Sequence, residues 1–312
     1  MTLVNYASML RLFLATCYRA IYRLHHALCL RPGKPLGHSS LVVVGSYRTG
    51  GAGKTPFCTW LAETLSAQGK RVAILCHEYA YDEAAMLREH FATSSQVKIF
   101  TTRNRYRLAH ELDRSQEFDF ILCDDGFEDS RLVEATTFVL LWGNAPTRLC
   151  ELWPLGIARS LAKDHSGHHS GSTVEIRCSE TAPEIRFILD NITNKKGEDL
   201  RSVQGSAHYR QINIFCGIGD PNRLCNDIQK QGIAITDKIF LKDHDRCFSN
   251  KLNKALQENP QSAFIITEKD AARLDNGTGK PLPRPDNLYI ARQKTIVDET
   301  LAHRILNELL NS

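Results

Sequence analysis

The stretch VVVGSYRTGGAGKTPFCTWLAE, residues 42–63, joins an apolar segment to a helical pattern through a glycine-rich turn. Residues 41–44 form a short run rich in β-branched side chains, which predicts a buried strand. Gly50, Gly51 and Gly53 allow the backbone to turn tightly and to bring its N–H groups close to an anion. The order of strand, glycines, Lys-Thr and helix therefore predicts a phosphate-binding loop.

This loop departs from the common spacing, because Arg48 stands where a first glycine is usual. Its core, G-G-A-G-K-T, predicts a deviant class of phosphate loop. We expect Lys54 to reach the β- and γ-phosphates of ATP, and Thr55 to offer its hydroxyl to Mg²⁺. The backbone around Ala52 and the N-terminus of the following helix complete the predicted ATP site.

Two carboxylates follow a second predicted strand, residues 118–122. They are Asp124 and Asp125. Ligands bind beyond the carboxyl ends of the strands in open α/β sheets, and Mg²⁺ prefers hard oxygen ligands. We therefore expect Thr55, Asp124 and Asp125 to hold a magnesium ion.

Short strands and helices alternate along most of the chain, which predicts an α/β fold. The first part predicts a deviant P-loop NTPase-type parallel sheet, and a second α/β/α domain follows. The predicted bounds are 1–34 for an amphipathic helix, 35–165 for the phosphate-loop domain, 166–210 for a linker with short strands and 211–312 for the second domain.

Residues 1–30 have apolar side chains at three- and four-residue steps, which predicts an amphipathic helix. Arg11, Arg19 and Arg23 interrupt the apolar residues, so the run falls short of the roughly 18 that a membrane span needs. No small-residue cleavage site follows, which argues against secretion. The apolar stripe fits a helix lying in a membrane interface and a helix packed on its own domain equally well.

Composition narrows the class of protein. The chain has 312 residues and a net charge of +4, with a sequence pI of about 8.5. This mild basicity suits ATP or an anionic membrane face and is too weak to indicate nucleic acid. The ten cysteines form no C-x-x-C pair, so we expect reduced thiols in a cytoplasmic protein.

Six stretches together resemble the tetraacyldisaccharide 4′-kinases of lipid A biosynthesis, and they occur in that family's order. The stretches are VVVGSYRTGGAGKTP, DDGFEDSRL, WPLGIARSLAK, CGIGDPNRL, LKDHDRCF and IITEKDAARL. The resemblance implies transfer of the γ-phosphate of ATP to the 4′-hydroxyl of a tetraacylated glucosamine disaccharide 1-phosphate, a lipid A precursor, giving lipid IVA. It also implies a peripheral or monotopic protein on the cytoplasmic face of the bacterial inner membrane, with the N-terminal helix at the membrane surface.

The resemblance also assigns residues. It implies Asp82 as the base that acts with His244, while Lys54 serves as the third catalytic group. Tyr79 keeps the family's tyrosine and is expected beside the nucleotide. The residues expected to bind substrate are Glu83, Arg103, Arg105, Glu128, Arg159 and Lys269.

Two departures from the family pattern leave other functions open. The loop between Tyr79 and Asp82 is almost absent, and Glu128-Asp129 replaces a Gln-His pair near the phosphates. Extra carboxylates should disfavour ATP unless cations offset them. One alternative is therefore a deviant P-loop ATPase stimulated by a partner. Another is a degenerate kinase that binds lipid or ATP as a scaffold or regulator.

Overall fold

The computed structural model describes residues 3–29, 32–48, 50–165, 171–178, 183–203, 209–243, 245, 247–274 and 285–311. These residues form two compact units. The first unit comprises residues 1–78, 94–186 and 297–312, and the second comprises 79–93 and 187–296.

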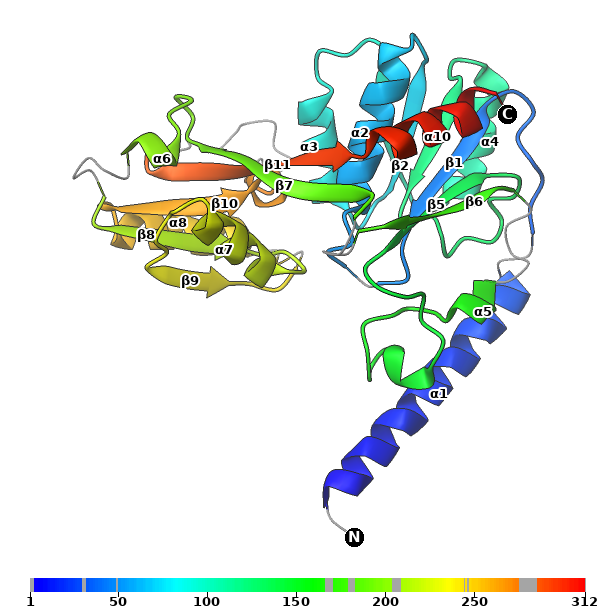
Figure 1. Ribbon diagram of the computed structural model, residues 1–312, viewed down its shortest axis with the longest axis horizontal. Coiled ribbons are helices and arrows are strands. Elements are labelled where there is room, and N and C mark those ends of the chain that lie inside the picture. The colour runs from blue at the N-terminus through cyan, green and yellow to red at the C-terminus, as the bar shows by residue number, and fades with distance from the viewer. Residues whose placement is uncertain are drawn as a thin grey trace. The chain divides into compact units, whose positions relative to one another are not determined.

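The first unit is built on a six-stranded parallel sheet with the order β3-β2-β4-β1-β5-β6 (Figure 1). Its strands are β1 Ser40–Gly45, β2 Val72–His77, β3 Val97–Thr102, β4 Phe120–Asp124, β5 Thr136–Leu141 and β6 Thr173–Arg177. Its helices are α1 Leu3–Cys29, α2 Lys54–Ala67, α4 Arg105–Ser115, η1 Leu149–Glu151, α5 Ala162–His165 and α10 Glu299–Leu310.

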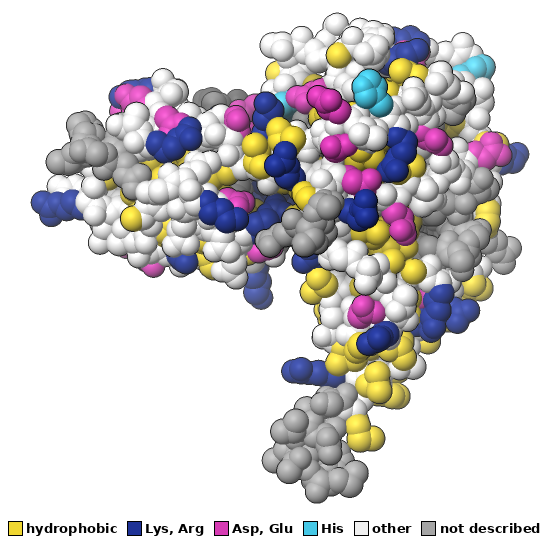
Figure 2. Space-filling view, viewed as in Figure 1, with side chains coloured by type: hydrophobic (Ala, Val, Ile, Leu, Met, Phe, Trp, Pro, Cys, Tyr) yellow, Lys and Arg dark blue, Asp and Glu magenta, His cyan; other side chains and the backbone are white. Residues whose placement is uncertain are grey.

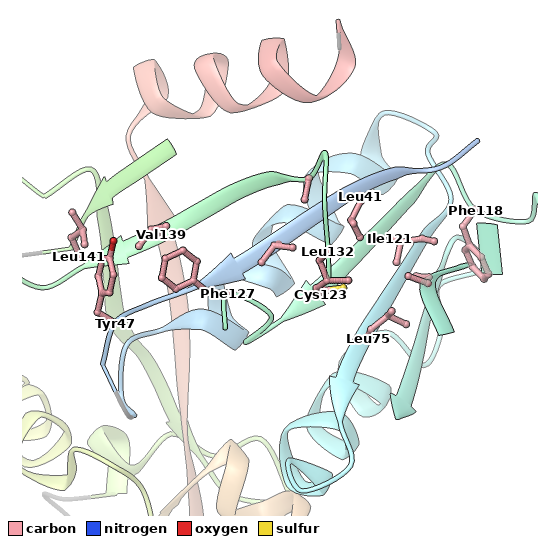
Figure 3. Packing of buried hydrophobic residues seen from close by; sticks show 14 residues of the cluster. Leu41, Tyr47, Leu75, Phe118, Ile121, Cys123, Phe127, Leu132, Val139 and Leu141 are labelled. Atoms are coloured by element: carbon pink, nitrogen blue, oxygen red, sulfur yellow. The ribbon is translucent and has the colours of Figure 1, made fainter. Parts of the chain in front are cut away.

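A hydrophobic cluster on the sheet explains why the strands have apolar sequences. It contains Leu41 of β1, Leu75 of β2, and Ile121 and Cys123 of β4 (Figure 3). Side chains of α4 pack against this cluster. The intervening residues of β1 and β4, such as Val42 and Leu122, are also fully buried, so both faces of these strands are covered.

The second unit contains a five-stranded sheet with the order β7-β11-β10-β8-β9, in which β11, β10, β8 and β9 pair in parallel. Its strands are β7 Ile185–Thr193, β8 Gln211–Cys216, β9 Asp237–Phe240, β10 Ser262–Thr267 and β11 Leu288–Val297. Its helices are α3 Tyr81–His90, α6 Leu200–Val203, α7 Pro221–Lys230, α8 Phe248–Glu258 and α9 Glu268–Ala272.

The α/β class is confirmed, whereas the two units differ from the predicted domain bounds. Helix α3, inside the predicted phosphate-loop domain, belongs to the second unit, and α10 belongs to the first. The predicted linker contributes β6 to one sheet and β7 to the other. The prediction followed continuity along the chain, but an amphipathic element packs on whichever apolar face is open to it.

Helix α1 turns its apolar stripe outward. Ala15 and His26 are buried, and Tyr22 lies on the same side of the helix. The opposite side carries exposed apolar residues (Figure 2): Leu10, Phe13, Leu14, Ile21, Leu24 and Leu28. The stripe is therefore not the surface by which α1 packs on its own unit. Among the described residues, no helix combines the length and apolarity needed to cross a membrane.

Candidate active site

The phosphate loop connects β1 to α2 through left-handed backbone. Gly51 has φ 63° and Gly53 has φ 82°, a backbone region that residues with a Cβ rarely adopt. Gly53 directly precedes α2, and its carbonyl accepts a hydrogen bond from the amide of Phe57. The indole N–H of Trp142 donates to the carbonyl of Ala52 at 3.0 Å, which fixes the loop from the side of β5. A 14-residue helix thus begins at Lys54, directly after the glycines, which is slightly earlier than the start near Pro56 that the sequence suggests.

The predicted metal-binding residues meet at this helix terminus. Strands β1 and β4 are neighbours, and Val44 pairs with Asp124 at their carboxyl ends. The Thr55 hydroxyl donates to the Asp124 carboxylate at 2.8 Å. The Nζ of Lys54 lies 3.4 Å from a carboxylate oxygen of Asp125. A hydroxyl and two carboxylates, all hard oxygen donors, are therefore grouped beside the loop, and this donor set fits Mg²⁺.

Asp125 is held between two cations. Arg159 donates to both of its carboxylate oxygens, at 3.1 and 3.0 Å, while Lys54 pairs with it as well. Burial acts to raise the pKa of Asp125, but Lys54, Arg159 and Arg105 outweigh it and lower that pKa. Asp125 also has φ 54°, which is uncommon for a residue other than glycine. The side chain is thus a fixed anion at the centre of the site.

The predicted arginines and Tyr79 have different surroundings. Arg105, at the start of α4, donates to the backbone carbonyl of Asp124 at 2.8 Å and so belongs to this site. Arg103 is largely exposed and pairs with Glu78. Tyr79 is also exposed and falls in the second unit. Only residues 78–80 separate β2 from α3. The family pattern has a longer loop at this place, and this chain lacks it.

Glu128 has partners that the sequence did not predict. The Tyr22 hydroxyl of α1 donates to it, and so does the Ser160 hydroxyl at 3.0 Å. Burial raises the pKa of Glu128, and these two hydrogen bonds offset the effect only in part. The neighbouring Asp129 pairs with Arg131 at 2.7 Å. Both extra carboxylates therefore have partners of their own, which weakens the argument that they repel ATP.

The second unit contains a separate cluster of charges around the start of α3. Asp82 is fully buried, and Arg273 lies 2.7 Å from its carboxylate. Lys269 lies 2.9 Å from Glu83 and 3.1 Å from Asp243. The structure thus brings together Asp82, Glu83 and Lys269, which were predicted from separate motifs. The predicted partner of Asp82, His244, lies outside the described residues.

Arg273 was not predicted from the sequence. It is buried and also bonds to Asp270 at 3.0 Å, to Asp243 at 3.1 Å and to the carbonyl of Gly217 at 2.8 Å. Desolvation lowers the pKa of Arg273, but the surrounding carboxylates outweigh this and raise it. Its place four residues after Lys269, on the same face of a helical turn, is the sequence signal that points to it.

Comparison with known proteins decides the family. A family model described as "LpxK: Tetraacyldisaccharide-1-P 4'-kinase" matches residues 7–85 and 77–311. The chain belongs to the tetraacyldisaccharide-1-P 4′-kinase family. The protein is therefore a kinase, as the resemblance implied, and the match favours a kinase over a partner-stimulated ATPase.

Individual family members agree with this assignment. The tetraacyldisaccharide 4′-kinase of Chlamydia abortus is 26% identical over 287 residues, covering 78% of this chain and 74% of the relative. That of Hydrogenovibrio crunogenus is 22% identical over 313 residues, covering 94% and 90%. A crystal structure of LpxK from Aquifex aeolicus in complex with ATP superposes with a TM-score of 0.64, at 17% identity and 98% coverage of both chains. This last likeness confirms the fold.

Proposed function

We propose that this chain transfers the γ-phosphate of ATP to the 4′-hydroxyl of a tetraacylated glucosamine disaccharide 1-phosphate, giving lipid IVA. Family membership supports the lipid A 4′-kinase class. One geometric observation supports the chemistry: Lys54 and Arg159 both pair with Asp125 at the end of β4. Two cations are therefore gathered beside a helix N-terminus, which is an arrangement suited to a triphosphate.

The residues of the phosphate loop would neutralise and orient ATP. Positive φ at Gly51 and Gly53 would let the backbone N–H groups around them face an anion bound at the start of α2. The triphosphate competes with Asp125 for Lys54, whose ammonium then neutralises phosphate oxygens. Thr55 and Asp124, with Asp125, would hold Mg²⁺, which when bound neutralises charge on the phosphates. Such transfer depends on position and charge more than on covalent chemistry.

Asp82, acting with His244, is the proposed acceptor of the proton from the sugar hydroxyl. In the described structure Asp82 is fully buried against Arg273, whereas the next residue, Glu83, is partly exposed beside Lys269. A base must come within hydrogen-bond reach of the hydroxyl, so the pair formed by Asp82 and Arg273 has to open for this role. Comparing the rate of phosphate transfer in Asp82→Asn with that in Glu83→Gln tests whether Asp82 is the base.

We also propose that α1 lies in the interface of the bacterial inner membrane, on its cytoplasmic face. Its outward stripe is apolar, and its sequence contains three arginines and no acidic residue. Arg11 and Arg23 are exposed at the margins of the stripe. Apolar burial combined with attraction to anionic headgroups is how amphipathic helices bind membranes. This location also agrees with the proposed acceptor, which is a lipid and therefore resides in the membrane.

The decisive experiment supplies the full chain with γ-labelled ATP, Mg²⁺ and tetraacyl-disaccharide 1-phosphate in detergent micelles. We expect label in the lipid, a loss of about 100-fold or more in Lys54→Ala, and near-normal transfer in Lys98→Ala, an exposed lysine paired with Glu117. Label in free phosphate alone would indicate the ATPase. Lipid binding without any transfer would indicate the scaffold or regulator.

A further inference from the structure

A short loop beside α1 presents large apolar side chains to solvent. We name residues 151–158 the Trp153 loop. Trp153 and Ile157 are each 54% exposed, although the residues at the base of the loop, Leu152 and Ala158, are buried. Two exposed apolar side chains of this size on one short loop call for an apolar partner.

The Trp153 loop is held in one shape. The amide of Trp153 donates to the carbonyl of Ala158 at 2.9 Å, and the amide of Ala158 donates to Glu151 at 2.9 Å. A Cβ added to Gly156 would lie 2.2 Å from the carbonyl oxygen of Glu151, so the close approach requires glycine. The loop therefore displays its apolar side chains on a fixed frame, which lowers the entropy lost when they bind.

The loop is continuous with α1. The rings of Tyr18 and Trp153 meet edge to face with their centroids 5.7 Å apart, and η1 packs against the helix. Tyr18 lies between the packed side of α1 and the exposed apolar side that contains Leu14 and Ile21. Figure 2 shows hydrophobic side chains both on α1 and on the adjacent part of the first unit. The Trp153 loop thus extends the apolar surface of the helix.

Charge and residue type favour a lipid surface as the partner. Arg148 is exposed three residues before the loop, and α1 contributes Arg11 and Arg23. Tryptophan is enriched at membrane–water interfaces, where its ring sits at the level of the headgroups. Cations beside such rings match anionic headgroups. A protein partner would not require this bias toward positive charge.

We propose that Trp153 and Ile157 insert into the interface of an anionic bilayer together with α1, so that two elements of the first unit contact lipid. This inference rests on the proposed membrane association of α1. Insertion of the loop would also bear on the active site, because the loop leads directly into Arg159. The backbone amide of Arg159 donates a hydrogen bond to the carbonyl of Tyr47, and its side chain pairs with Asp125, so this residue is held in place.

The test uses the full chain and vesicles of phosphatidylglycerol and phosphatidylethanolamine that carry brominated acyl chains, which quench nearby tryptophan. We expect vesicles to quench part of the emission of the wild type, and this part to be missing in Trp153→Phe. The remaining tryptophans, Trp60 and Trp142, lie in α2 and directly after β5 and serve as internal references.

A second measurement is co-sedimentation. The double variant Trp153→Ser/Ile157→Ser should lower vesicle binding on the order of tenfold, because two apolar side chains no longer enter lipid. The matched control, Ile188→Ser/Phe240→Ser, replaces exposed apolar residues of the second unit and should bind normally. Normal sedimentation without quenching of Trp153 would overturn the role of the loop and leave the anchor α1 intact. No sedimentation of the wild type would overturn both.

Discussion

The hydroxyl of Tyr22, in α1, donates a hydrogen bond to the carboxylate of Glu128, in the loop after β4. Glu128 also accepts a hydrogen bond from Ser160, whose neighbour Arg159 pairs with Asp125. The helix is therefore attached to the two segments that carry the ion pair of the phosphate site. Through these partly buried contacts the position of α1 bears on the geometry of Asp125.

Replacing Tyr22 with phenylalanine should destabilise the first unit by about 1–3 kcal/mol, because the partly buried Glu128 loses a donor. The transfer of phosphate should slow as well, since Arg159 is positioned through Ser160. Urea unfolding and a steady-state assay would measure the two effects. Tyr81→Phe, at an exposed position, is the control and should change stability by less than about 0.5 kcal/mol. Equal stability of both variants would contradict the prediction.

The stability of Glu128→Gln relative to the wild type should increase as the pH rises. Burial raises the pKa of Glu128, so the folded protein binds this proton more tightly than the unfolded chain does. The stability from Glu128 is therefore full below the ordinary carboxyl pKa of 4.5 and is lost as the pH rises through the raised value. Glutamine keeps an acceptor for Tyr22 and avoids the buried charge. The free energy of unfolding, compared at about pH 4 and about pH 8, should shift in favour of the variant. A constant difference would show that Glu128 does not titrate over this range.

Arg273→Gln should destabilise the second unit by about 3–5 kcal/mol. The change leaves the buried carboxylates of Asp82 and Asp270 without their guanidinium partner. The matched control is Arg201→Gln, which breaks a solvent-accessible pair with Asp199 and should have a far smaller effect on stability. Chemical denaturation monitored on each variant would separate the two cases, and similar losses would count against a special role for Arg273.

Asp113→Asn should loosen the segment that leads into β1. The carboxylate accepts the amides of Gly37, His38 and Ser39 at 2.8–2.9 Å. Burial acts to raise the pKa of Asp113, but these bonds outweigh it and lower that pKa. The stability from this group is thus present above the ordinary pKa of 3.8 and is lost as the pH falls through the lower folded value.

We expect this variant to lose about 1–3 kcal/mol at neutral pH and to approach the wild type in strong acid. Unfolding curves recorded across that range would measure the convergence. A loss that stays the same at every pH would contradict an ionic role for Asp113.

Gly45→Ala should destabilise the first unit, because a Cβ at this position would lie 2.1 Å from the Cβ of Phe127. Overpacking of this kind costs about 1–3 kcal/mol or more. Gly50→Ala is the matched control for the fold, since nothing lies within 4 Å of its added Cβ. It should retain the melting temperature while weakening ATP binding at the loop. Equal melting temperatures for the two variants would refute the packing argument.

The sequence predicted the parts of the site that depend on local order. The glycines, Lys54 and Thr55 follow a buried strand, and Asp124 follows another. Neighbouring parallel strands bring their carboxyl ends together, so these residues had to meet. The bond between Arg273 and Asp82 joins positions 191 residues apart, and that between Tyr22 and Glu128 joins positions 106 apart. No periodicity encodes such pairs.

The outward direction of α1 was also beyond the sequence. The spacing of its apolar residues establishes that the helix has a stripe and says nothing of what the stripe faces. The structure decides it through polar contacts on the other side of the helix: Arg19 pairs with Asp164 at 2.6 Å, and Tyr22 bonds to Glu128. The roles of Asp82 and His244 in catalysis remain predictions, because His244 lies outside the described residues.

The return of α10 to the first unit has a consequence for synthesis on the ribosome. Leu301, Ile305 and Leu309 of this helix are buried, and residues 297–312 belong with β1–β6. Residues 187–296 therefore leave the ribosome before the first unit has its last helix. The unit that starts first is completed last, which reverses the usual order of folding during translation. Apolar surface that α10 will cover stays open in the nascent chain, and chaperones that bind such surface are expected to act on it.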